Sequence, residues 1–205
     1  MGRLSIIGAL VFLPAALRLA PAQSTSPEDL AGGKLLVASR DLSDPNFAKS
    51  VVLLVKYDDD GVLGLIINRR SKVAISHVLD DLAGAKERTD LVYSGGPVQS
   101  DQVMALLRAH SKPDDSDHVV GDVYLVPSKD ALEKALSSAA ESSLRVYVGY
   151  AGWSVGQLEH EVDLGAWYIF RGDPATVFDS EPDSIWPRLI RQTELQIASA
   201  RVHQR

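Results

Sequence analysis

The sequence predicts one α+β domain over residues 33–205. Two β-rich runs, Val51–Val55 and Leu63–Asn68, flank an Asp60-Gly61 turn, which is the pattern of a β-hairpin. Further along, a helical pattern over residues 129–140 lies between two more strand patterns. Strands that occur in hairpins and also alternate with helices favour an α+β domain over a doubly wound sheet or an all-β sandwich.

The other strands are predicted from short apolar runs bounded by turn residues. They are residues 34–38, 91–93, 122–126, 144–150 and 166–170, whereas residues 103–109 fit either a helix or a strand. The charged segment 112–117 predicts a loop. The two runs of the hairpin are apolar at nearly every position, so we expect both faces of the hairpin to be covered.

Helices are predicted where apolar residues recur three or four positions apart. Residues 76–82 carry a short apolar face of this kind, and Ser128 can cap a helix over residues 129–140. Residues 157–162 predict a single helical turn. Residues 184–201 predict a terminal helix with a proline in its first turn, where proline is tolerated.

The first 22 residues have the layout of a secretory signal peptide. Arg3 precedes an apolar stretch over residues 4–17, and Ala20-Pro21-Ala22 offers small residues at a cleavage point. Removal of residues 1–22 would leave residues 23–32 as a linker before the domain, in a periplasmic or secreted protein. The alternatives are an uncleaved tail or a misassigned start codon, with the protein in the cytoplasm. We expect no membrane span in the mature chain, because no other stretch is long and apolar enough.

Composition excludes several classes of site. The chain of 205 residues has no cysteine, which rules out disulfides, thiolate metal sites and a cysteine nucleophile. Its net charge of −6 argues against nucleic acid as a partner. The five histidines form no paired spacing, and the acidic runs 58–60 and 114–117 do not match a calcium-binding loop. We therefore expect neither a metal nor a cofactor.

One short motif points to catalysis. Gly152-Trp153-Ser154-Val155-Gly156 is a G-x-S-x-G sequence, which in α/β-hydrolases exposes a nucleophilic serine between a strand and a helix. Several acids follow it, and His203 would complete the order of a Ser–acid–His triad. The motif is short enough to arise by chance, His203 lies three residues from the end of the chain, and no HGGG-type segment precedes the serine. A small exported hydrolase that uses Ser154 is therefore an alternative interpretation.

Five blocks of sequence in a fixed order resemble the AlgH/YqgE family of bacterial proteins. The blocks are Gly33–Ser39, Asp44–Phe47 with Ser50–Val55, Gly64–Arg69, Tyr93–Gln99, and Gly149–Trp153 with Gly156–Glu161 and Trp167. The resemblance implies an α+β fold with a bifurcated, partly barrel-like β-sheet surrounded by helices. It also implies that Gly152 and Gly156 are structural parts of a Gly-Trp-x-x-Gly-Gln turn, because the family pattern does not require serine at position 154.

The chain departs from the family pattern in three places. Arg70 stands where the family commonly has proline, and residues 104–108 read Met-Ala-Leu-Leu-Arg where a Leu-His pair is usual. Members of the family are normally cytoplasmic and have no signal peptide. Since the family is named for a proposed role in transcription, an exported member could not act by touching DNA.

The residues of the resembling blocks favour binding over catalysis, because they are rich in Gly, Pro, Trp and Asn and poor in acid–base pairs. We therefore expect a non-enzymatic domain that binds a protein or a small-molecule ligand, with a regulatory role by resemblance. The candidate binding residues are Asn68, Gly95, Gly96, Tyr150, Trp153, Gln157 and Glu159. Glutamine and glutamate there could orient a polar ligand while tryptophan supplies apolar area. A serine hydrolase is the second interpretation, and a DNA-binding regulator is the third.

Overall fold

The computed structural model describes residues 23–203, so the predicted signal peptide at residues 1–22 lies outside the described residues. The strands are β1 Gln23–Ser24, β2 Lys34–Ala38, β3 Val51–Asp58, β4 Gly61–Ile66, β5 Arg70–Ala74, β6 Leu91–Ser94, β7 Val98–Arg108, β8 Asp117–Val120, β9 Val123–Val126, β10 Leu144–Trp153 and β11 Trp167–Arg171. The α-helices are α1 Ile75–Val78, α2 Lys129–Ser138, α3 Gln157–Asp163, α4 Pro174–Val177 and α5 Ile185–His203. Short 3-10 turns lie at Pro27–Asp29, Glu141–Ser143 and Pro182–Ser184.

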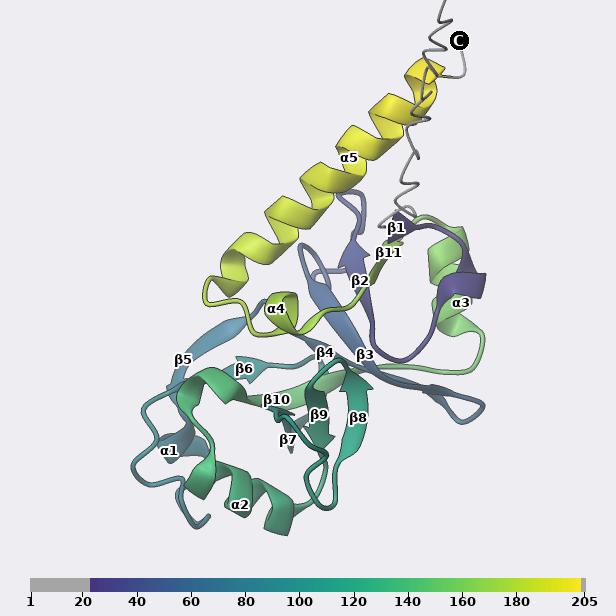
Figure 1. Cartoon of the computed structure of the whole chain (residues 1–205). Coiled ribbons are helices and arrows are strands. Elements are labelled where there is room, and N and C mark those ends of the chain that lie inside the picture. Colours follow the sequence, from purple (N-terminus) through teal and green to yellow (C-terminus); the bar gives the residue numbers. More distant parts are fainter. Residues whose placement is uncertain (1–22, 204–205) are drawn as a thin grey trace, which may run out of the picture.

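The strands form one branched sheet in the order β1-β11-β2-β3-β4-β10-β7-β9-β8, with β5 and β6 on a side branch (Figure 1). All strand pairs are antiparallel except β6 with β10. The branch point is β10, which pairs with β4 over residues 151–153 and with β7 and β6 before that. The predicted α+β class and branched sheet are confirmed, and the sheet does not close into a barrel.

Two hydrophobic cores lie against this sheet. The larger core contains buried residues of β2, β3, β4 and β11, including Leu53, Ile66 and Trp167. The smaller core packs α2 against the first half of β10, with Leu132 and Val146 among its buried members. Alternating residues of β10 face opposite sides, as the two-residue period of a strand requires.

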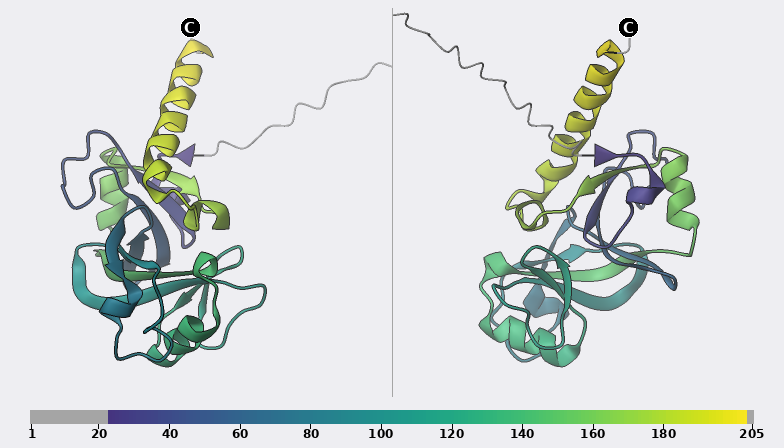
Figure 2. Two further views of the ribbon diagram at one scale, coloured as in Figure 1. Left: turned by 90° about the vertical axis from the view of Figure 1, so that its left-hand side faces the viewer. Right: turned by 45° about the vertical axis from the view of Figure 1, so that its right-hand side comes forward.

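Helix α5 extends away from the rest of the molecule in every view (Figure 2). Its first turn is fixed to β2 by Trp186, whose indole Nε1 donates a hydrogen bond to the carbonyl oxygen of Ala38 at 2.8 Å. The helix continues to His203 beyond this anchor. Within the described residues, no helix has both the length and the apolar character that a membrane crossing needs.

Most of the predicted elements are present. The hairpin around Asp60-Gly61 is confirmed as β3 and β4, and the helix predicted over 129–140 is α2, with Ser128 Oγ accepting a bond from Ala131 N at 3.2 Å. Residues 103–109 fit either a helix or a strand by sequence, and all but the last belong to β7.

Two predicted boundaries are wrong. The helix expected over 76–82 ends at Val78, because the chain turns at Leu79 and its later apolar residues pack from a loop. The segment 112–117 was expected to be a loop, but its last residue begins β8, which pairs with β9. β5 was not predicted, because its largely exposed residues give no apolar run.

Candidate functional site

A surface groove lies where the β3–β4 hairpin meets the end of β10 and the start of α3. Its volume is about 430 Å³. The lining residues are Lys56, Asp60, Gly61, Val62, Leu63, Val98, Tyr150, Gly152, Trp153, Ser154 and Gln157. The chain can leave β10 and enter α3 here because Gly156 has a φ of +78°, which favours glycine. The groove therefore contains the turn that the sequence marked with G-x-S-x-G.

The wall of the groove is held by the carboxylate of Glu161 on α3. Its Oε2 accepts a hydrogen bond from Trp153 Nε1 at 3.0 Å and another from Trp167 Nε1 at 2.8 Å. Its Oε1 accepts a third bond from Gln157 Nε2 at 3.1 Å. One carboxylate therefore fixes a strand-end tryptophan, a tryptophan of β11 and a helix glutamine.

Aromatic contacts complete this wall. Phe47, from the loop between β2 and β3, stacks on Trp153 with ring centroids 5.7 Å apart and meets Trp167 edge-on at 5.6 Å. The two tryptophan rings are themselves 6.0 Å apart in a T-shaped arrangement. Such edge and offset geometries are the favourable ones for aromatic pairs, so the three rings form a rigid cluster.

Ser154 lies at the rim of the groove and is exposed. Its backbone N–H donates to Gln157 Oε1 at 3.1 Å, which ties the turn to the helix that follows. Within the described residues, no histidine or carboxylate is hydrogen-bonded to its hydroxyl, and His203 lies at the end of the projecting helix α5 (Figure 1). A serine hydroxyl needs such a hydrogen-bonded base to become a strong nucleophile.

Glu159 points to a different neighbour. Tyr57 on β3 donates its hydroxyl to Glu159 Oε1 at 2.5 Å. This bond, together with burial, raises the pKa of Tyr57 to about 12, because ionising the tyrosine would destroy the bond and place two negative charges together. Glu159 therefore fastens α3 to β3.

Asn68 also bonds within the fold. Its Oδ1 accepts from Val51 N at 2.7 Å, and its Nδ2 donates to the carbonyl oxygen of Lys49 at 3.0 Å. Lys49 has a φ of +58°, so the amide of Asn68 holds a left-handed turn just before β3. Asn68 as a whole is 7% exposed, so its amide is engaged inside the protein.

Gly95 and Gly96 are required by close backbone packing. A Cβ on Gly95 would lie 2.2 Å from the carbonyl oxygen of Gly149, and one on Gly96 would lie 2.2 Å from the carbonyl carbon of Tyr150. The register between β10 and β7 shifts between Val148 and Tyr150. The two glycines therefore let the chain pass against an irregular point of β10.

The groove brings together three of the seven predicted binding residues, namely Tyr150, Trp153 and Gln157. Asn68, Gly95, Gly96 and Glu159 are not among its lining residues. Sequence reasoning missed Glu161, although its position four residues after Gln157, on the same face of a helix, was a usable signal.

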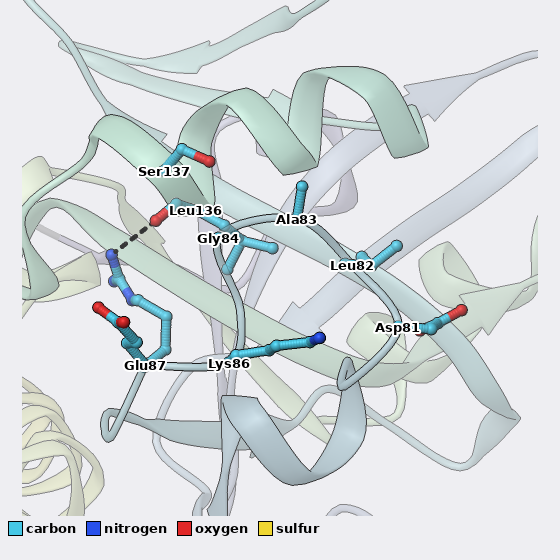
Figure 3. Close-up of a pocket in the computed structure, with 9 residues that line it drawn as sticks. Asp81, Leu82, Ala83, Gly84, Lys86, Glu87, Leu136 and Ser137 are labelled. Atoms are coloured by element: carbon cyan, nitrogen blue, oxygen red, sulfur yellow. Dashed lines mark hydrogen bonds between the residues drawn. The ribbon is translucent and has the colours of Figure 1, made fainter.

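A second cavity, of about 680 Å³, lies between the loop 81–88 and the end of α2 (Figure 3). Its buried charged residue, Arg88, is bound to partners within the fold. Arg88 forms a two-pronged ion pair with Asp90, with Nη2 2.7 Å from Oδ2, and its Nη1 donates to the carbonyl oxygens of Leu136 and Ala139 at 3.4 and 2.7 Å. These bonds close the C-terminal end of α2, so the arginine has a structural task. The described residues contain no group of three side chains placed to bind a metal.

Comparisons with known proteins agree with this architecture. Curated relatives called UPF0301 proteins include one from Streptomyces avermitilis, 35% identical over 175 residues, covering 81% of this chain and 88% of the relative. Another, from Mycobacterium tuberculosis, is 33% identical over 176 residues, covering 83% of this chain and 86% of the relative.

Two solved structures share the fold. The solution structure of the AlgH protein from Pseudomonas aeruginosa matches with a TM-score of 0.62 and 30% identity, over 83% of this chain and 87% of that one. A crystal structure of a Corynebacterium diphtheriae protein matches with a TM-score of 0.67 and 23% identity, over 80% and 87% of the two chains. A family model described as AlgH-like matches residues 35–198. The chain belongs to the AlgH-like family.

Proposed function

We propose that this protein is a binding protein that recognises a segment of another protein in the groove beside Trp153, and that it is not an enzyme. The proposal is based on one observation: the polar groups of the groove wall are hydrogen-bonded to one another. Glu161, Gln157 and both tryptophans are bonded to one another, so they shape a surface, and the Glu161 carboxylate is occupied as an acceptor and not placed as a catalytic base.

The openness of the groove favours a protein segment over a small molecule. Small-molecule sites enclose most of their ligand's surface, whereas Lys56, Asp60 and Ser154 on this rim are exposed. Val155, beside the rim, is 70% exposed and offers apolar contact. A surface with an apolar centre, a mixed polar rim and a rigid aromatic wall is typical of protein recognition.

Rigidity supports the same conclusion. Trp153 is fixed by Glu161 on one edge and by Phe47 on one face, so partner binding would cost little ordering of this wall. The regulatory role that the family resemblance implies would then be exerted through a protein partner, in keeping with the acidic net charge of −6.

Site-specific photocrosslinking in the native host tests this proposal. A photoreactive residue is placed at Ser154 or Asp60 on the groove rim, and at Val73 on β5, which is 45% exposed, as a control. We expect the two rim positions to capture one and the same protein that the Val73 position does not. Ser154→Arg, which fills the rim without touching the core, should reduce capture from the Asp60 position. Capture that is identical from all three positions, or no capture from the rim, would overturn the proposal.

A further inference from the structure

A third cavity lies on the opposite half of β10, away from the groove. Its volume is about 420 Å³. It lies over β5, β6 and the start of β10, and it is covered by the segment that follows α4. We call it the Arg145 cavity and define it by Arg70, Tyr93, Arg145 and Phe178.

Strand register places Arg70, Tyr93 and Tyr147 in one row, with Arg145 two residues away along β10. Arg70 on β5 is paired across the strands with Tyr93 on β6, and Tyr93 is paired with Tyr147 on β10. Arg145 precedes Tyr147 by two residues on the same strand, so both side chains project from the same face of the sheet. The sheet therefore aligns two arginines and two tyrosines beneath the cover formed by Phe178.

The guanidinium of Arg145 is buried, with only 7% of the residue exposed. Its Cζ lies 4.8 Å from the ring centroid of Tyr93 and 5.4 Å from that of Phe178. Its Nη2 donates a hydrogen bond to the backbone carbonyl oxygen of Asp179. Its Nη1 is buried and has no hydrogen-bond partner among the described residues.

Within the described residues, no carboxylate lies within ion-pair distance of Arg145. The acids around it have other partners: Asp90 is paired with Arg88 and Asp179 with Arg188, each at 2.7 Å. Glu141, which lines the cavity, is exposed and accepts a bond from Thr89. Arg145 lies near enough to the Asp179 carboxylate for their charges to attract. No carboxylate of the described residues bonds to its guanidinium directly, and a bound anion would supply that contact.

One tyrosine of the row adds a neutral hydrogen-bond donor to the cavity. Tyr93 lines the cavity, whereas Tyr147 lies fully buried beside the Arg145 guanidinium, with which its hydroxyl interacts. Burial raises the pKa of Tyr147 and also that of Tyr93, and the nearby charge of Arg145 opposes the shift in both. The hydroxyl of Tyr93 therefore keeps its proton at neutral pH, and a protonated hydroxyl can donate to an anion.

We propose that the Arg145 cavity binds a small anion, a carboxylate or a phosphate group, on the free Nη1 of Arg145. The exposed Arg70 supplies the second positive charge, and the rings of Tyr93 and Phe178 keep the guanidinium plane in place. An arginine edge is well suited to either oxyanion, since its N–H groups match the spacing of the oxygens. This site is separate from the groove, so it stands or falls independently of the proposed partner binding.

Thermal unfolding of the full-length protein against increasing sodium phosphate or sodium acetate, at constant ionic strength with sodium chloride, tests the site. We expect one of the two anions to raise Tm in a saturable way. Saturation with phosphate alone assigns a phosphate site, and saturation with acetate alone assigns a carboxylate site. Arg145→Gln should weaken binding by at least about tenfold and Arg70→Ala by about threefold, because each removes a charge-assisted contact. Arg171→Ala, at an exposed arginine on β11, is the matched control and should leave binding unchanged.

NMR provides the decision if Arg145→Gln does not fold. In the wild-type protein, the side-chain Nε–Hε signal of Arg145 should shift in step with the Tm titration. The proposal is overturned if neither anion produces saturable binding, if the Arg145 signal stays in place, or if Arg171→Ala weakens binding as much as Arg70→Ala does.

Discussion

Trp153 and Trp167 donate their indole N–H groups to the same oxygen atom, Oε2 of Glu161, at 3.0 and 2.8 Å. The tryptophans come from different strands, and the carboxylate comes from the helix between them. Removing the carboxylate would leave two largely buried N–H donors without an acceptor. Stability then falls by the desolvation cost of each unsatisfied donor.

Glu161→Ala is expected to lower the free energy of unfolding by about 2–4 kcal/mol. Glu161→Gln should cost less, because its amide oxygen can still accept one bond. Urea denaturation followed by tryptophan fluorescence measures both. Asp163→Ala, an exposed position on the same helix, serves as the control and should change stability by about 0.5 kcal/mol or less. Equal stability of Glu161→Ala and the wild type would show that the carboxylate does not hold the groove wall.

Gly95→Ala is expected to destabilise the protein by about 3 kcal/mol or more, because the new Cβ would meet backbone and not a movable side chain. Gly32→Ala is the matched control, since nothing lies within 4 Å of a Cβ at that position. It should change stability by about 1 kcal/mol or less. Denaturation midpoints of the two purified variants provide the comparison, and similar midpoints would contradict the close approach of Gly95 to β10.

The Tyr57–Glu159 bond predicts a dependence of stability on alkaline pH. The pKa of Tyr57 is raised in the folded protein to about 12, from an ordinary value of 10.0, so folding favours the protonated tyrosine. This stabilisation is complete below pH 10 and is lost as the pH rises toward 12. Stability of the wild type should therefore fall more steeply across that window than stability of Tyr57→Phe.

Ultraviolet titration of tyrosine ionisation gives a direct check on the same bond. Glu159→Gln should bring the pKa of Tyr57 back toward its ordinary value, because the charged acceptor is the largest cause of the shift. An unchanged titration curve in Glu159→Gln would mean that the bond does not form in solution.

Ser154 is expected not to react with a fluorophosphonate probe. Without a hydrogen-bonded base, a serine hydroxyl remains a weak nucleophile. Intact-protein mass spectrometry after incubation, with Ser154→Ala as the reference, measures this. An adduct on the wild type that is missing from Ser154→Ala would restore the hydrolase interpretation.

The layout of residues 1–22 predicts cleavage during export. The protein isolated from its native host should then begin at Gln23, as read by N-terminal sequencing or intact mass. A full-length mass of 22.2 kDa would contradict this expectation and favour the alternative of a cytoplasmic protein.

The sequence predicted local structure better than long-range partners. The continuous apolar runs of β3 and β4 and the capped apolar period of α2 depend on neighbouring residues alone, so they could be predicted from the sequence. The partners of Glu161 lie on β10 and β11, and no local rule joins them. Arg145 gave no signal either, because an arginine in a strand is ordinarily an exposed residue, and only the three-dimensional arrangement shows its burial.

In the candidate site, too, the local turn could be predicted from the sequence, whereas the long-range contacts could not. The Gly-Trp-x-x-Gly-Gln turn was located from its residues, and the structure places that turn at a groove. The grouping of Asn68 and Glu159 with it rested on shared membership of the resembling blocks. Residues characteristic of a family can be retained for backbone packing as well as for binding, and these two side chains bond within the fold.

Strand β10 pairs with β4 at one end and with β6 and β7 at the other, and this has a consequence for how the protein unfolds. One end of this strand lines the groove at Trp153, and the other end carries Arg145, while the strand itself borders both hydrophobic cores. Neither core can open while β10 keeps its hydrogen bonds, so both should be lost in one cooperative transition. The amides of β10 should accordingly exchange with solvent only through global unfolding. An anion at Arg145 would then slow exchange along the whole strand, including the residues that face the groove.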